Sequence, residues 1–157
     1  SSNWFNSFTI DKGTADGMKV NMNVMAGKGL IGIITEVGTH YAIVDTIIND
    51  ASSVSAQISD KGQNLITTGS LKDMTESNVI RISSLEDPSA SVAAGDAVVT
   101  SNISDKYLPG ILIGYVTNLT NDANKLTRSG SLTPAADFKK LREVLVITQI
   151  KETGDHE

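Results

Sequence analysis

The sequence contains no cysteine, and its 157 residues include only two histidines, three prolines and 4% aromatic residues. The lack of cysteine excludes disulfides, thiol nucleophiles and zinc–thiolate sites. The acidic residues are dispersed and form no D-x-D-x-D-G loop or histidine–acid cluster, so we expect no metal and no cofactor. The net charge is −5 and the basic residues are scattered, which argues against a nucleic-acid partner.

Long apolar runs are also missing. No stretch approaches the roughly 20 apolar residues that cross a bilayer, and no signal peptide is visible. Because the sequence starts abruptly with "SSNW", these absences say little about a longer protein. Hydrophobic residues at 39% and charged residues at 20% are typical of a globular chain that buries a core.

Apolar and polar residues alternate with a period of two along most of the chain. Examples are "VNMNVM" (20–25), "VSAQI" (54–58) and "VIRI" (79–82), a pattern typical of half-buried strands. Turn signals such as "ADG", "SDKG" and "LPG" separate these runs. Only "PAADFKKLRE" (134–143) predicts a short helix, near the C-terminus. Short strands with almost no helix predict an all-β antiparallel barrel or sandwich.

The stretch "AGKGLIG" places Gly27, Gly29 and Gly32 in the spacing G-x-G-x-x-G, and Asp50 follows where a ribose-binding acid would lie. A dinucleotide site also requires a helix directly after the glycines, whose N-terminus holds the pyrophosphate. The continuation at 30–37 is instead rich in β-branched residues and predicts a strand. The motif without this context does not predict nucleotide binding.

An internal repeat gives these glycines a different interpretation. The stretch "IGIITEV" (31–37) matches "IGYVTNL" (113–119), and each follows a glycine turn. This similarity predicts a duplicated β unit, at about 1–58 and 85–150, with an additional hairpin at about 63–84 between the copies.

Five glycines are therefore predicted to be structural. Gly27, Gly29 and Gly110 are expected in tight turns. Gly32 and Gly114 are expected within strands, where a barrel bends sharply or another backbone packs closely.

Four blocks of the sequence carry a family resemblance. They are the region from "IDKGTADGMKV" to "VDTIIND", then "GDAVVTSN", "YLPGILIGYV" and "PAADFKKLREVLVI". In their order and spacing they resemble the extracytoplasmic domain of the rod shape-determining MreC family, over about residues 8–150. One departure is Asn102, where the family usually has glycine.

The resemblance implies two small six-stranded-type antiparallel β-barrels in tandem, similar to the double barrel of trypsin-like proteases, with one short helix near the C-terminus. We assign residues 1–60 to the first barrel unit and 61–150 to the second. The hairpin 63–84 could belong to either unit. Residues 151–157 are expected to be a flexible tail.

The resemblance also implies a function without catalysis. Such proteins are membrane-anchored scaffolds of the cell-wall elongation machinery, on the extracytoplasmic side of the cell membrane, and they are required for cell shape. The implied partners are further copies of the protein, MreD, and the class B penicillin-binding transpeptidase with its glycosyltransferase partner. The family's N-terminal membrane helix and coiled coil are missing from this sequence.

A trypsin-like hydrolase with a degenerate active site is the alternative that this architecture raises. His40 could be a base with Asp45 or Asp50. The expected nucleophile turn, however, reads Gly-Asp-Ala at 95–97 and lacks the serine. We therefore predict no enzymatic activity.

Candidate contact residues come from the scarce aromatics, because exposed aromatic side chains often anchor interfaces. We select Trp4 and Phe5, close to where a coiled coil would join, together with Tyr41, Tyr107 and Tyr115. Strand edges are a second candidate surface, because sheets also associate by pairing their edge strands.

Overall fold

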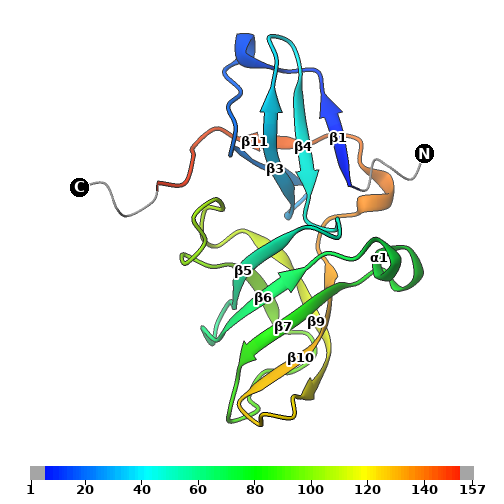
Figure 1. Ribbon diagram of the computed structural model, residues 1–157, viewed down its shortest axis with the longest axis vertical. Helices are drawn as coiled ribbons and strands as arrows, with labels where there is room; N and C mark the ends of the chain where they lie inside the picture. Colours follow the sequence, from blue (N-terminus) through cyan, green and yellow to red (C-terminus); the bar gives the residue numbers. More distant parts are fainter. Residues whose placement is uncertain (1–5, 153–157) are drawn as a thin grey trace.

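The computed structural model describes residues 6–152, which form two β-sheets joined end to end (Figure 1). Among these residues, no helix has the length and apolar content needed to cross a bilayer. Both sheets are built from antiparallel pairs of short strands, which confirms the predicted all-β class.

The first sheet has five strands in the order β1-β4-β3-β2-β11. Their bounds are β1 (Ser7–Ile10), β2 (Asn23–Ala26), β3 (Gly29–Val37), β4 (Ala42–Thr46) and β11 (Leu145–Ile147). A short 3₁₀ turn, η2 (Thr14–Asp16), lies between β1 and β2.

The second sheet is a closed barrel in the order β10-β7-β6-β5-β8-β9. Its strands are β5 (Ser53–Ile58), β6 (Asn64–Thr68), β7 (Ile80–Glu86), β8 (Ala97–Thr100), β9 (Leu112–Asn121) and β10 (Thr127–Pro134). The period-two pattern sets which side chains face the barrel interior, where alternate residues such as Val54, Ala56 and Ile58 are buried.

Two closed barrels were predicted, and only one is observed among the described strands. The first sheet is open, with β1 and β11 as its edges. The first sheet stays open because it pairs only five strands, one fewer than the six that close the barrel.

Strand pairing also differs from the predicted division at residue 60. Strand β5 pairs with β6 and β8 in the barrel, whereas β11 pairs with β2 in the first sheet. The last strand of each predicted unit, β5 or β11, therefore pairs in the sheet that the other unit forms. The hairpin predicted at 63–84 lies in the barrel as β6 and β7, with α1 (Leu71–Ser77) between them.

Helix α1 was missed, and the helix predicted at 134–143 is reduced to the 3₁₀ turn η3 (Phe138–Lys140). Ser70 caps α1 by accepting a hydrogen bond from the Asp73 N–H at 3.1 Å. The helix is only seven residues long and buries one residue, Met74, so it carries no amphipathic pattern.

The predicted strand at 20–25 begins three residues later, at Asn23. Asn21 has a φ of 78°, in the left-handed region, so a strand cannot pass through it. Val20 is consequently 44% exposed instead of facing the core.

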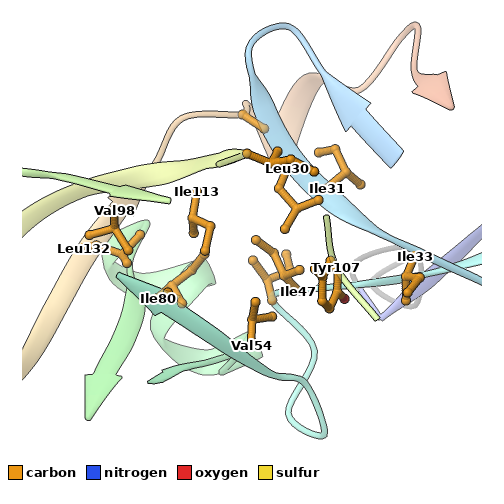
Figure 2. Packing of buried hydrophobic residues seen from close by; sticks show 14 of the residues in the cluster. Leu30, Ile31, Ile33, Ile47, Val54, Ile80, Val98, Tyr107, Ile113 and Leu132 are labelled. Carbon is orange, nitrogen blue, oxygen red and sulfur yellow. The ribbon is translucent and has the colours of Figure 1, made fainter. Parts of the chain in front are cut away.

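The core extends through both sheets as one cluster of buried hydrophobic residues. Figure 2 shows Leu30 and Ile31 of β3 near Ile47, and Ile80 with Ile113 inside the barrel. The two sheets therefore share a hydrophobic interface.

Strands β3 and β9 are related by the sequence repeat, and their central glycines have the same environment. A Cβ on Gly32 would lie 2.0 Å from the Asp45 carbonyl oxygen, and one on Gly114 would lie 2.0 Å from that of Thr133. The backbone of the neighbouring strand therefore leaves no space for a side chain.

We expect Gly32→Ala and Gly114→Ala each to lower the free energy of unfolding by about 2 kcal/mol or more, because a backbone carbonyl must shift. Chemical denaturation measures this loss. Gly17→Asn is the control, since Gly17 faces open space and asparagine tolerates its φ of +84°. Equal stability of the alanine variants and the parent chain would contradict this account.

Candidate interaction surfaces

A buried asparagine joins the two sheets. Asn23 of β2 is fully buried, and its Nδ2 donates to the Lys106 carbonyl at 3.1 Å. Its Oδ1 accepts from the Leu108 N–H at 2.9 Å. Since residues 106–108 belong to the loop between β8 and β9, this amide fastens a loop of the barrel to the first sheet.

Tyr107 lies within this loop and is only 7% exposed, so it is not the surface contact that the sequence predicted. Asn23 bonds to Lys106 and Leu108, the residues on either side of Tyr107. These two hydrogen bonds orient the loop so that the tyrosine ring points inward. Figure 2 shows the ring near Ile47 and Ile33. Burial raises the pKa of the Tyr107 hydroxyl above its ordinary range, and the charge of Asp45 adds to this effect.

We expect Asn23→Ala to lower the free energy of unfolding by about 2 kcal/mol, because the Leu108 N–H loses its acceptor in a buried site. The same change should let Tyr107 ionise at lower pH, which ultraviolet titration of the tyrosines detects. Asn124→Ala, in an exposed turn, is the matched control. An unchanged titration curve in Asn23→Ala would contradict the proposed role of the amide.

An ion pair between the buried Asp87 and the partly buried Arg128 holds the loop at the other end of the barrel. The Asp87 carboxylate accepts from the Val92 N–H at 2.9 Å, from the Ser91 N–H at 3.0 Å and from Arg128 Nη1 at 2.8 Å. Burial acts to raise the pKa of Asp87, but these hydrogen bonds outweigh it and lower the pKa to about 2.

Asp87 makes stability depend on pH. Its pKa is lower in the folded chain than the ordinary value of about 3.9, so the stabilisation is present above pH ~4 and is lost as pH falls toward 2. We expect about 2 kcal/mol of unfolding free energy to disappear over this range. Asp87→Asn should be less stable at pH 7 and should lose less on acidification. Parallel pH profiles for the two chains would contradict this.

The residues of the hydrolase alternative are engaged elsewhere or lie apart. His40 is exposed in the β3–β4 turn, at the end of the molecule away from the barrel (Figure 1). Asp96 accepts from Lys61 Nζ at 3.0 Å and from the Ala93 N–H at 2.9 Å, and Ala97 begins β8 where a nucleophile would be needed. No group of three or more potential metal ligands occurs among the described residues.

The other predicted contact residues have mixed positions. Tyr41 is 40% exposed and donates to Glu36 Oε2 at 3.0 Å, a hydrogen bond that raises the pKa of the tyrosine. Tyr115 is half-buried on β9, with Lys28 Nζ 5.9 Å from its ring centroid. Trp4 and Phe5 lie outside the described residues 6–152.

The remaining predicted glycines lie in turns or at a close contact. Gly27 and Gly110 have φ values of +57° and +83°, as tight turns require. Gly29 instead lies beneath Ala136, whose backbone nitrogen would be 2.5 Å from an added Cβ.

Sequence reasoning missed a groove between the two edges of the first sheet, which we call the edge groove. It has a volume of about 650 Å³ and is lined by residues 8–12, by residues 141–144 and by Val146. Its apolar lining residues are Phe8, Ile10, Leu141, Val144 and Val146. The only sequence signal for it is the alternation of these apolar residues, which is the same as that of ordinary core positions.

A closed barrel and an open sheet with an apolar groove define a β-rich domain with two related sheets over residues 6–152. The sequence profile described as "Rod shape-determining protein MreC, barrel core" matches residues 1–148. The chain belongs to this family.

The relatives agree with this assignment. The cell shape-determining protein MreC of Listeria monocytogenes is 30% identical over 154 residues, covering 98% of this chain and 52% of the relative. The MreC of Bacillus subtilis is 31% identical over 165 residues, covering 99% of this chain and 56% of the relative. The chain thus spans about half the length of these relatives.

Solved structures show the same fold. The L. monocytogenes MreC structure superimposes with a TM-score of 0.84 at 30% identity, covering 98% of this chain and 74% of that one. The major periplasmic domain of a cell shape-determining filament MreC superimposes with a TM-score of 0.68 at 28% identity, covering 83% of this chain and 78% of that one. A chain in a complex between penicillin-binding protein PBP2 and MreC from Helicobacter pylori gives a TM-score of 0.64 at 17% identity, covering 90% of this chain and 86% of that one.

Proposed function

We propose that this chain is the extracytoplasmic part of a membrane-anchored, non-catalytic scaffold that positions peptidoglycan synthases and is required for cell shape. The family match over residues 1–148 carries this proposal. One structural relative is a periplasmic domain, which supports the location, and the lack of a serine at Ala97 argues against hydrolysis.

The proposed partners are a class B penicillin-binding transpeptidase with its glycosyltransferase partner, MreD, and further copies of the chain. The H. pylori complex supports the first, since it joins an MreC to a penicillin-binding protein. The filament named for a relative at 28% identity supports self-association. Tyr41 and Tyr115 remain candidate contacts, because part of each ring is accessible.

We expect the immobilised chain to capture the ectodomain of a class B transpeptidase from the same organism, and depletion of the protein to round the cells. Gly17→Asn, whose side chain faces open space, is the folded control and should capture equally well. Failure of the folded chain to retain the ectodomain, together with normal cell shape after depletion, would overturn the proposal.

A further inference from the structure

The two sheets have the same strand order except at one position. Around the repeated strands, β4, β3 and β2 of the first sheet correspond to β10, β9 and β8 of the barrel. Outside them, β1 corresponds to β7 and β11 to β5. In the barrel β6 lies between β7 and β5, whereas no strand formed by residues 6–152 lies between β1 and β11 in the first sheet.

The missing strand leaves apolar side chains uncovered. Inward-facing residues of β5 and β7, such as Val54 and Ile80, are at most 1% exposed. Phe8 and Val146 lie opposite the fully buried Val44 and Val24, so they face inward too, yet they are only half-buried. They line the edge groove at the place that β6 occupies in the barrel.

The backbone of β1 also faces this groove. The Thr46 N–H donates to the Asn6 carbonyl at 2.9 Å, and bonded positions in an antiparallel pair recur at every second residue. Phe8 and Ile10 therefore point their backbone groups toward β4. Thr9 points its N–H and C=O toward the groove, as an added strand requires.

The walls and charges of the groove favour a single extended segment. One wall is β1, and the other is the chain leading into β11 together with Val146, so the edge of a second copy's sheet would bring a neighbouring strand into one wall. Its charges balance, with Asp11 and Glu143 against Lys12 and Arg142, which matches an uncharged occupant. Strand β6, the counterpart in the barrel, is uncharged and turns Leu65 and Thr67 inward.

We propose that the edge groove binds one extended, uncharged segment of a partner protein, with uncharged side chains such as leucine and threonine at the alternate, inward-facing positions. This segment adds as a strand between β1 and β11 and closes the first sheet into a second six-stranded barrel. The binding itself is independent of the scaffold function proposed above, which bears only on the natural source of the segment.

The test uses a fluorescein-labelled synthetic peptide with the sequence of residues 63–69, "QNLITTG", and the complete 157-residue chain. We expect saturable binding by fluorescence anisotropy. Amide hydrogen exchange should slow at Ser7 and Thr9 when the peptide binds. A peptide with aspartate in place of Leu65 should not bind, because its charge would enter the apolar groove.

Thr9→Pro is the decisive variant, since it removes the N–H that faces the groove and leaves the bonded positions of β1 intact. We expect binding to weaken about tenfold or more. Thr9→Val keeps the N–H and should bind like the parent chain. Exchange in the parent chain provides evidence that does not depend on the folding of either variant.

Three outcomes of the peptide experiments would overturn the proposal. They are absence of saturable binding at millimolar peptide, equal binding by Thr9→Pro and Thr9→Val, and peptide-induced protection confined to β5 and β7, which would show displacement of β6. Protection of Ser7 and Thr9 on concentrating the chain alone would assign the groove to a second copy and would also overturn it. Because no transpeptidase is present, failure here leaves the scaffold function to its own capture test.

Discussion

The amide of Asn23 lies where the two sheets meet, and the arrangement of the molecule depends on it. It is fully buried and bonds to both sides of Tyr107, so a loop of the barrel is held against β2. A buried amide is favourable only when its partners are in place, which makes this contact specific as well as stabilising. The hydrophobic cluster that continues from Ile31 to Ile113 supplies the larger, less directional attraction.

The exchange of β5 and β11 reinforces this junction. The chain leaves the first sheet at β4, completes the barrel with β5, and returns from β10 to the first sheet with β11. The barrel strands β5 to β10 are continuous in the sequence, whereas β11 joins the first sheet only after the chain has passed through the barrel. The two sheets are therefore expected to unfold together, as small domains with a shared core commonly do.

Local signals predicted the features that depend on neighbouring residues. The repeat around Gly32 and Gly114 was visible because it rests on short stretches of similar sequence. The local alternation places Asn23 on the polar face of a strand. Its burial was not predicted, because it depends on Lys106, 83 residues away in the sequence. The edge groove was equally hidden, because a period-two pattern shows which residues face inward but not how many strands a sheet will hold. Helix α1 was too short to have a period.

An open edge is a risk in a β protein, because unpaired backbone groups favour aggregation. Strand β1 limits this risk by being only four residues long and by ending next to Asp11 and Lys12. The barrel shows that the same strand arrangement can be closed by one further strand, so openness is not imposed by the geometry of the unit. One copy of the repeat supplies a closed, stable core, while the other keeps a position free. In the scaffold proposed above, the closed copy would maintain the fold while the open copy would offer its edges to the proposed segment.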